Sequence, residues 1–354
     1  MGRSGVSPLY GLAVLPKLQR VKTGASRSIS YAQVPLRDLD VYPDFFAART
    51  IAHGLYSAVR NKRFRYDFVL FNGIASLSRF SQAGYPLFRL MQAMHVPTFI
   101  YWHETGWVFD RLQREHPRTF RRVAHAASHP SVVHLAASRA CGRSVGQWFP
   151  RAVPIPVYEC TAVPAPFDRP IPPAEPPMVV NLASIQERKG TDLFVETAIK
   201  VCQQHPTVEF LWLGDGREFG TWRQEIDRAG LQDRILFPGY VEAPYLLLRR
   251  ASVLFLSSRD DPFPLSVLEA MCLGRTVVTF DAGGAPEALA GHGHVVAPFD
   301  TDAAADTILS CLAKPPTERM NLALRDRYFE WYTPEKFAQR LDKVLRNHIG
   351  AGEK

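Results

Sequence analysis

The sequence predicts an α/β protein with two domains, each built as a doubly wound, Rossmann-like sheet of parallel strands. Its 354 residues suit two domains of ordinary size. Short apolar runs alternate with segments long enough for helices, and their near-continuous apolar character favours parallel sheets covered on both faces. A proline-dense stretch, VPAPFDRPIPPAEPPM at 163–178, reads as a stiff linker that divides the chain into halves of similar character.

The predicted elements follow from this alternation. Seven apolar runs are predicted strands, at 67–71, 98–102, 131–136, 178–183, 209–213, 252–256 and 276–280. The segments 190–206 and 218–230 carry apolar residues at helical spacing, and Gly230 suits a C-cap. Two such domains would enclose a cleft between the carboxyl ends of their strands, where ligands usually bind.

The beginning of the chain departs from this pattern. Gly2, Gly5 and a helix-like stretch, PLYGLAVLPKLQR, come before any apolar strand. Either the first strand of the amino-terminal domain is missing from this chain, or this domain begins differently.

Composition and charge narrow the class of protein. The hydrophobic content of 46% and charged content of 21% are normal for a soluble globular protein. The net charge of +8 favours anionic partners without choosing among nucleotide phosphates, acidic lipid headgroups and nucleic acid. Five scattered cysteines without C-x-x-C spacing indicate neither a disulfide framework nor a zinc site. No apolar run is long enough to cross a bilayer and no signal peptide is evident, so we expect a cytoplasmic protein.

The stretch SSRDDPFPLSVLEAM, at 257–271, carries the first candidate site. It reads as the end of a buried strand, a proline-bounded turn holding Asp261, and a helix that contains Glu269 and is closed by Gly274. The amino end of this helix, at Pro264–Ser266, presents backbone N–H groups that favour phosphate. Taken alone, the stretch favours an acidic turn before a surface helix.

Two more strand–turn–helix junctions have groups suited to phosphate. NLASIQERKGTDL, at 181–193, places Arg188, Lys189 and Gly190 before a helix, where lysine can reach a phosphate and glycine permits close approach. FDAGGAPEAL, at 280–289, places Gly283 and Gly284 in the same setting. The first junction is also compatible with a solvated basic turn, and paired glycines are a weak signal by themselves.

The order of these motifs resembles the donor domain of the family 4 retaining glycosyltransferases, which have the GT-B fold. RKG, LGDG (213–216), FPGYV (237–241), SSRDDPFPLSVLEAM and AGGAPE follow one another between about 178 and 300. In that family two acidic residues separated by seven others contact the donor. The resemblance therefore implies that Asp261, in place of the more usual glutamate, contacts sugar hydroxyls and that Glu269 contacts the nucleotide ribose. It also implies that Lys189 holds the diphosphate.

The resemblance further implies a set of donor-binding residues. Gly239, Tyr240 and Val241 would lie beside the base, and the backbone at Phe263, Pro264, Leu265 and Ser266 would contact the sugar and diphosphate. Arg188 and Gly190 of the RKG motif, with Gly283 and Gly284, complete the set. The family often carries an arginine a few residues before the lysine, where this chain has Ala183 or Ser184. One phosphate contact is therefore absent or supplied from elsewhere.

The amino-terminal half resembles the family at YWHETGW, 101–107. His103 directly follows a predicted strand, and the family commonly has a histidine there, near the transferred sugar or the acceptor. Histidine can position a hydroxyl or exchange a proton near neutral pH, and it can equally satisfy a loop backbone group. Glu104 could orient His103, face the acceptor or lie at the surface. We place Gly2, Gly5 and Glu104 on the acceptor side.

The predicted domains are then an acceptor-side domain at 1–165, a donor-binding domain at 166–327, and a segment at 328–354. This last segment resembles the family's closing helix, which crosses back to the first domain. Its Trp331 and Tyr332 are expected to pack rather than to bind ligand.

The expected activity is retaining transfer of a sugar from a nucleotide sugar to a hydroxyl acceptor, such as a polysaccharide or glycolipid precursor. Basic groups and a helix terminus would stabilise the leaving diphosphate, so we expect neither a metal ion nor a cofactor. The alternatives are a nucleotide-sugar epimerase on the same fold and a non-catalytic GT-B partner protein.

The arginine-rich stretch RLQREHPRTFRRVAH, at 111–125, suggests peripheral contact with an anionic membrane surface at the inner face of the membrane. Such an enzyme could use a lipid-linked acceptor. The stretch is also compatible with a solvated charged face. No nucleic-acid-binding motif is present, so we expect no nucleic-acid partner.

Overall fold

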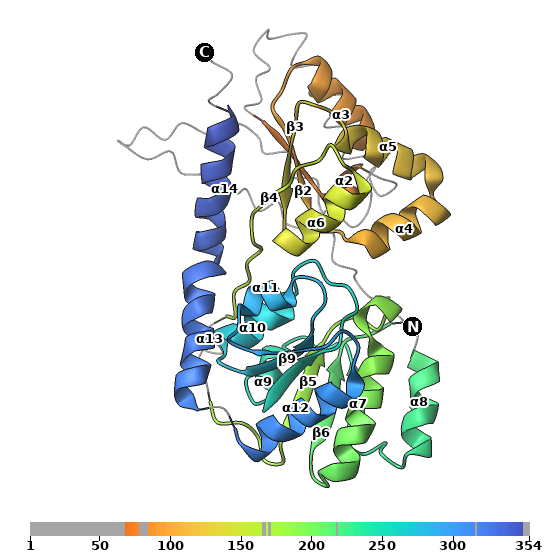
Figure 1. Cartoon of the computed structure of the whole chain (residues 1–354), viewed down its shortest axis with the longest axis vertical. Coiled ribbons are helices and arrows are strands. Elements are labelled where there is room, and N and C mark those ends of the chain that lie inside the picture. The colour runs from red at the N-terminus through yellow and green to blue at the C-terminus, as the bar shows by residue number, and fades with distance from the viewer. Residues whose placement is uncertain are drawn as a thin grey trace. The chain divides into compact units, whose positions relative to one another are not determined.

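The computed structural model of the chain describes residues 68–77, 84–164, 168, 171–216, 219–315 and 317–349 (Figure 1). The chain divides into two compact units. The first contains the described residues up to Ala137, Cys141–Val157 and the described residues from Arg340; the second contains Ser138–Ala140 and Tyr158–Gln339. Gly2, Gly5 and the predicted start of the first domain lie outside the described residues.

The first unit has a four-stranded parallel sheet in the order β1-β2-β3-β4. Its strands are β1 (Val69–Asn72), β2 (Thr98–Trp102), β3 (Val132–Ala136) and β4 (Ile155–Pro156). The helices between them are α2 (Gly73–Leu77), α3 (Gly84–Ala93), α4 (Gly106–Glu115), α5 (Pro117–Ala127) and α6 (Arg139–Trp148). The core of the unit is aromatic: Trp102 is fully buried and contacts the rings of Phe109 and Phe149.

The second unit has a six-stranded parallel sheet in the order β10-β9-β8-β5-β6-β7. Its strands are β5 (Met178–Leu182), β6 (Glu209–Leu213), β7 (Ile235–Gly239), β8 (Val253–Leu256), β9 (Thr276–Phe280) and β10 (His294–Val296). Its helices are η2 (Glu187–Lys189), α7 (Thr191–Gln204), α8 (Phe219–Arg228), α9 (Tyr245–Leu248), α10 (Leu265–Cys272), α11 (Ala285–Leu289), α12 (Thr301–Ala313) and α13 (Glu318–Trp331). The last helix, α14 (Pro334–Ile349), begins in this unit, and its residues from Arg340 belong to the first.

The strand order of the second sheet reverses between β5 and β8. The chain runs from β5 through β6 to β7 on one side, then returns to pair β8 with the other edge of β5 and continues through β9 to β10. Helices α7 and α12 lie side by side against one core of this sheet (Figure 1). A reversal of strand order leaves a crevice at the carboxyl ends of the two central strands, where ligands of doubly wound sheets bind.

The predicted α/β class with two parallel sheets is confirmed. All seven predicted strands are present, and those at 98–102, 209–213 and 276–280 have the predicted bounds. Strands β4, β7 and β10 were not predicted, because β4 and β10 are very short and β7 contains Pro238. A proline is tolerated in β7 because that strand lies at the edge of the sheet. Helices 190–206 and 218–230 correspond to α7 and α8, and Gly230 ends α8 in the left-handed conformation.

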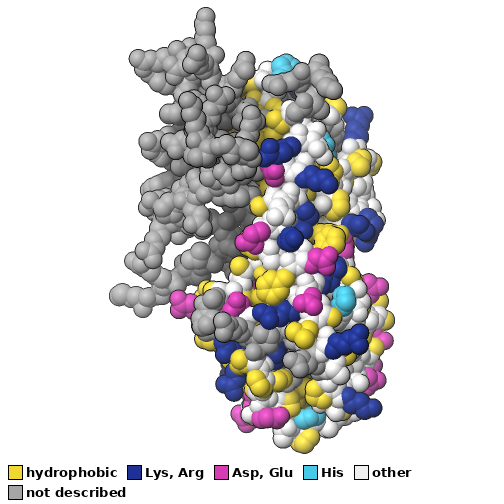
Figure 2. Space-filling model, turned by 90° about the vertical axis from the view of Figure 1, so that its left-hand side faces the viewer, with side chains coloured by type: hydrophobic (Ala, Val, Ile, Leu, Met, Phe, Trp, Pro, Cys, Tyr) yellow, Lys and Arg dark blue, Asp and Glu magenta, His cyan; other side chains and the backbone are white. Residues whose placement is uncertain are grey.

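The surface carries charges of both signs. On the face drawn in Figure 2, described Lys and Arg side chains alternate with Asp and Glu side chains, so the net positive charge is not gathered there into one patch. No helix among the described residues is long and apolar enough to span a bilayer.

Candidate functional site

Two loops meet at the point where the strand order of the second unit reverses. The first, Glu187–Gly190, follows β5 and is called here the basic turn; the second, Arg259–Pro264, follows β8 and is called the acidic loop. They are neighbours because β5 and β8 are adjacent parallel strands, so their carboxyl ends reach the same edge of the sheet. The RKG and RDDPFP motifs, which are far apart in the sequence, therefore lie next to each other in the fold.

Lys189 and Asp261 form an ion pair between these loops. The Lys189 ammonium contacts Asp261 Oδ2, and the two side chains are only 16% and 9% exposed. The predicted phosphate-binding cation and the predicted sugar-binding carboxylate thus lie within contact of each other. A diphosphate brought to this lysine would share or replace the carboxylate contact, because both anions use the same ammonium protons.

Gly190 is required by the backbone at the end of the basic turn. Its φ of 67° lies in the left-handed region, and it serves as the C-cap of η2 and the N-cap of α7. A Cβ at this position would come within 3.0 Å of the carbonyl oxygen of Ser257, closer than real Cβ atoms come. Only glycine allows the basic turn to pack this closely on the strand-end backbone of β8.

Helix α10 follows the acidic loop and carries Glu269. The helix begins at Leu265 with Pro264 as its N-cap and ends before Gly274, which has a φ of 61°, as predicted. Burial raises the pKa of the Glu269 carboxyl to about 7, against a smaller lowering effect of a hydrogen bond with Thr161. A carboxyl with this pKa exchanges a proton near neutrality, so its charge is adjustable by a ligand.

The other predicted residues around α10 differ in exposure. The Phe263 side chain is buried, with its ring 5.5 Å from that of Tyr158 and 5.4 Å from that of Tyr332. Ser266 is buried, whereas Leu265 is exposed. The buried ring of Phe263 anchors the loop, and the predicted contact of the Phe263–Ser266 backbone with the donor stays a prediction.

Gly283 and Gly284 pack against the acidic loop. A Cβ on Gly283 would come within 3.0 Å of Asp261 O, and one on Gly284 within 3.0 Å of Pro262 O. The Gly284 amide donates a 2.8 Å hydrogen bond to Asp261 O. The paired glycines therefore support the loop that holds Asp261, and a direct donor contact from them stays a prediction.

The LGDG and FPGYV motifs border the same edge of the sheet. Gly214 and Gly216 approach the carbonyl oxygens of Ala183 and Ile185 more closely than a side chain would permit. In FPGYV, Gly239 ends β7 with a φ of 79°. The next two residues after it are accessible: Tyr240 is 79% exposed and Val241 half-buried. These positions are accessible, and the base contact of this segment stays a prediction.

Two residues that sequence reasoning missed also hold the acidic loop. The fully buried Ser138 donates a 2.6 Å hydrogen bond to Pro262 O. Glu287, in the first turn of α11, accepts a 2.7 Å bond from the hydroxyl of Tyr158, whose ring stacks on Phe263. Glu287 was expected in the first turn of the helix after the paired glycines but was given no contact with the acidic loop, whereas Ser138 lies 124 residues from its partner and carries no local signal.

In the first unit, His103 and Glu104 follow β2 as predicted. His103 Nε2 hydrogen-bonds Asn72 Oδ1, and because an amide oxygen only accepts, this nitrogen carries the proton. The Glu104 carboxylate accepts backbone N–H bonds from Ile74 at 2.6 Å and from His103 at 3.0 Å. Glu104 therefore holds the backbone at the ends of β1 and β2, and its predicted roles of orienting the His103 side chain or facing the acceptor stay predictions.

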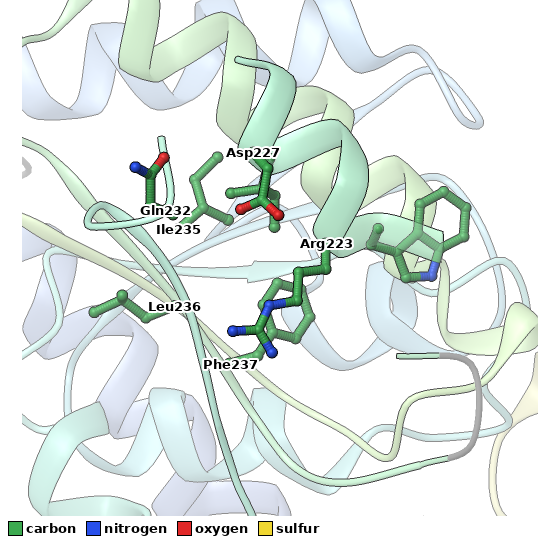
Figure 3. A pocket seen from close by; sticks show the side chains of 8 residues that line it. Arg223, Asp227, Gln232, Ile235, Leu236 and Phe237 are labelled. Carbon is green, nitrogen blue, oxygen red and sulfur yellow. The ribbon is translucent and has the colours of Figure 1, made fainter. Parts of the chain in front are cut away.

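A separate pocket of about 290 Å³ lies between α8 and β7 of the second unit (Figure 3). Arg223 projects from α8 toward Phe237 of β7, and Asp227 of the same helix also lines the pocket. None of its lining residues belongs to the predicted site. Among the described residues, no group of three or more His, Cys, Asp and Glu side chains could hold a metal ion.

Comparison with known proteins finds a match within the second unit. Residues 176–314 match the family model of glycosyl transferases group 1. This matched segment is called here the group 1 domain. The basic turn, the acidic loop and α10 all lie within this domain.

Relatives of the group 1 domain carry the same kind of name. One of them, a component of the phosphatidylinositol N-acetylglucosaminyltransferase of Arabidopsis thaliana, is 31% identical over 170 residues, which are 47% of this chain and 37% of that protein. The lipopolysaccharide core biosynthesis mannosyltransferase LpcC of Rhizobium leguminosarum bv. viciae is 34% identical over 140 residues, 37% of this chain and 39% of that protein. The matches thus span less than half the length of these relatives.

Solved structures extend the likeness from the group 1 domain to most of the chain. Sucrose-phosphate synthase from Thermosynechococcus elongatus has a TM-score of 0.69 at 20% identity and covers 90% of this chain and 81% of its own. Anabaena HepE in complex with UDP and glucose has a TM-score of 0.66 at 17% identity, with coverages of 89% and 84%. The chain has the GT-B fold that the motif order predicted.

Proposed function

We propose that the chain is a family 4 retaining glycosyltransferase that moves a sugar from a nucleotide sugar to a hydroxyl acceptor. One observation carries the proposal: at the strand-order reversal of the group 1 domain, the basic turn and the acidic loop join Lys189 to Asp261 beside the start of α10. The relatives named as N-acetylglucosaminyl- and mannosyltransferases and the structure of HepE with UDP and glucose support a nucleotide-sugar donor.

Each group has a proposed task in transfer. Negative charge builds on the leaving diphosphate as the bond to the anomeric carbon breaks, and Lys189, Arg188 and the N–H groups at the start of α10 stabilise it. These fixed positive groups do the work that a divalent ion does elsewhere, so the reaction is proposed to need no metal and no cofactor. Asp261 accepts hydrogen bonds from the sugar hydroxyls, and Glu269 accepts hydrogen bonds from the ribose. His103 positions the acceptor or the transferred sugar.

The acceptor side of the proposal has its own support. Helix α5 carries Arg118, Arg121 and Arg122, all exposed, and no acidic residue. Such a face is attracted to acidic lipid headgroups, which fits a lipid-linked acceptor at the inner face of the membrane. Sedimentation with vesicles of phosphatidylcholine, with and without phosphatidylglycerol, tests it. Binding that requires the anionic lipid and is lost in R118E/R121E supports the membrane role; equal sedimentation of this variant would refute it.

The central experiment measures transfer by the purified chain from a panel of nucleotide sugars. Lys189→Ala and Glu269→Ala are expected to lower kcat/KM by about a hundredfold or more, because the first removes the charge that stabilises the leaving diphosphate and the second removes the group that binds the donor ribose. Lys200→Ala is the matched control, because Lys200 lies on α7 and pairs at the surface with Glu196 and Asp302. Product NMR reports retention at the anomeric carbon, and full activity in EDTA supports metal independence.

Three outcomes would contradict the proposal in different ways. Full transfer by both site variants would refute the residue assignment. An isomerised nucleotide sugar formed without acceptor would indicate the epimerase instead. Calorimetry that detects no binding of any nucleotide or nucleotide sugar would indicate the non-catalytic partner protein.

A further inference from the structure

Arg259 is a third cation at the site, and none of the proposed tasks uses it. Its guanidinium forms a two-bond ion pair with the Asp192 carboxylate, Nη1 with Oδ1 and Nη2 with Oδ2. Both side chains are about 30% exposed. Burial alone would raise the pKa of the Asp192 carboxyl, but the hydrogen bonds and charge of Arg259 have a larger effect and lower it. The hydrogen bond with Asp192 in turn raises the pKa of Arg259. The pair is therefore ionised, with its guanidinium fork fully directed at one carboxylate.

Arg259 also ties the acidic loop to the basic turn. Its Nη1 donates to the carbonyl oxygen of Glu187 at 3.1 Å. Its backbone amide donates to Arg188 O at 2.9 Å, and the Asp260 amide donates to the same oxygen at 3.3 Å. Arg188 returns a 2.7 Å bond from Nη1 to Asp260 O. The two loops are thus joined through both backbone and side chains, from residues about 70 positions apart.

Lys189 lies in the middle of these attachments. It is the last residue of η2, a single three-residue turn, and its own amide bonds only to Gln186 O. Lys189 itself contacts Asp261 through its ammonium and accepts a 3.2 Å bond from the Ser257 hydroxyl at its carbonyl oxygen. A turn this short has little stability of its own, so the position of the ammonium also depends on what holds the neighbours of Lys189. Those neighbours, Glu187 and Arg188, are the residues that Arg259 contacts.

We propose that Arg259 is a positioning residue of the donor site: with Asp192 it holds the basic turn so that Lys189 meets the donor diphosphate. This inference rests on the proposed function. The opposing possibility is that Arg259 is itself a phosphate ligand and replaces the arginine absent at Ala183 or Ser184. The geometry favours positioning, because the guanidinium fork already binds Asp192 and has turned a further N–H to Glu187 O.

The two roles predict opposite effects of releasing Arg259. If Arg259 positions the turn, Asp192→Asn and Arg259→Ala both break the same attachment and both weaken diphosphate binding. If Arg259 binds phosphate, Asp192→Asn frees the guanidinium and tightens binding, while Arg259→Ala weakens it. Arg259→Lys keeps the charge but not the two-pronged geometry, and positioning predicts only partial rescue.

The experiment compares wild type, R259A, R259K, D192N and the surface control K200A by calorimetry. The probes are UDP-glucose and inorganic pyrophosphate, the second reporting the diphosphate subsite alone. We expect R259A and D192N each to weaken both probes about tenfold, and to raise donor KM with kcat changed less than threefold. K200A is expected to stay within twofold. A purely structural defect would lower the active fraction and leave KM unchanged. Tighter binding by D192N would overturn the inference in favour of a phosphate ligand.

A readout without donor separates this inference from the proposed function. The amides of Arg259 and Asp260 both bond to Arg188 O, so their hydrogen exchange reports whether the two loops are joined. We expect R259A and D192N to accelerate exchange about tenfold at 187–190 and 259–261, with α12 unchanged. Unaltered exchange in both variants would overturn the positioning role, whereas a wild type that binds neither probe, with accelerated exchange in the variants, would instead refute the proposed function.

Discussion

The strand-end loops of the two units are held by different chemistry. In the second unit, side chains pair charge with charge: Lys189 with Asp261, and Arg259 with Asp192. In the first unit, the carboxylate of Glu104 is used on backbone N–H groups, and His103 pairs with a neutral amide. The difference shows which unit has charged side chains at its strand ends that can bind an anionic ligand. The loops of the second unit keep a lysine that an anionic ligand can engage, whereas those of the first unit keep an imidazole that pairs with a neutral amide.

Each unit nevertheless uses a left-handed glycine at the strand end. Gly73 has a φ of 68° and Gly190 a φ of 67°. A Cβ on Gly73 would meet the carboxylate of Glu104, which is the far end of a flexible side chain, whereas a Cβ on Gly190 would meet the backbone oxygen of Ser257. Side chains move aside cheaply and strand-end backbone does not, so equal φ angles predict unequal costs.

The largest expected effect is the loss of stability in Gly190→Ala. Left-handed strain alone costs about 1 kcal/mol for alanine, and the forced shift of the Ser257 backbone brings the total to about 3 kcal/mol or more. Gly230→Ala isolates the strain, because Gly230 also has a φ of 67° and no atom lies within 4 Å of its Cβ position. Urea unfolding followed by hydrogen exchange measures both, with Gly73→Ala expected between them. Equal destabilisation by Gly190→Ala and Gly230→Ala would show that the close packing of the basic turn has no energetic weight.

The second expected effect is a loss of stability at low pH that affects the first unit and not the ion pairs of the second. His134, on β3, accepts a 3.1 Å bond at Nδ1 from the indole N–H of Trp102, and burial lowers the pKa of His134 to about 4. Because the unfolded chain binds this proton near the ordinary pKa of 6.5, stability is complete above pH 6.5 and is lost as the pH falls toward 4. The shift is equivalent to about 3 kcal/mol. The lowered pKa of Asp192 keeps its pair with Arg259 ionised over the same range.

We therefore expect the first unit to lose protection against hydrogen exchange between pH 6.5 and 4 while the Arg259–Asp192 region keeps it. His134→Gln retains an acceptor for the Trp102 N–H but has no proton site. The difference in unfolding free energy between wild type and this variant should shrink by about 3 kcal/mol as the pH falls across that window. An identical pH profile in the two proteins would exclude His134 as the source.

The sequence predicted the parts of the site better than their connections. Lys189, Asp261 and Glu269 were proposed as site residues from motif order, and the helix after the acidic loop was bounded correctly by Pro264 and Gly274. The ion pair of Lys189 with Asp261 was not predicted, because it joins residues 72 positions apart through the adjacency of β5 and β8. Local pattern carries no information on which strands become neighbours, so it cannot reveal long-range attachments.

The same limit applies to the fold. Apolar runs such as TFIYW and TVVTF predicted strands to the residue because burial on both faces leaves an uninterrupted apolar pattern. The edge strand β7 escaped prediction because it is only partly buried and contains Pro238, both of which weaken that pattern. Arg259 reads locally as a solvated charge, and only the structure shows that it is paired with Asp192.

The smallest expected effect concerns Glu269, whose carboxyl has a pKa of about 7 because of burial. If ribose hydroxyls donate to this group, as proposed, the donor binds its ionised form, and binding releases a proton. The ionised fraction rises about tenfold between pH 6 and pH 8 for a group of this pKa, so donor affinity should strengthen by up to about tenfold over that range and level off above it.

Calorimetry of UDP-glucose binding in buffers of different ionisation enthalpy measures both the affinity and the proton released. Glu269→Gln is the matched control, because the amide has similar size and accepts a hydroxyl bond but does not titrate. Its affinity should be nearly independent of pH from 6 to 8, and its binding should release no proton from this site. Affinity that weakens with rising pH in the wild type would mean that the donor prefers the protonated carboxyl. Glu269 would then donate to the donor rather than accept from it, and the assignment of the ribose to this carboxylate would have to be reversed.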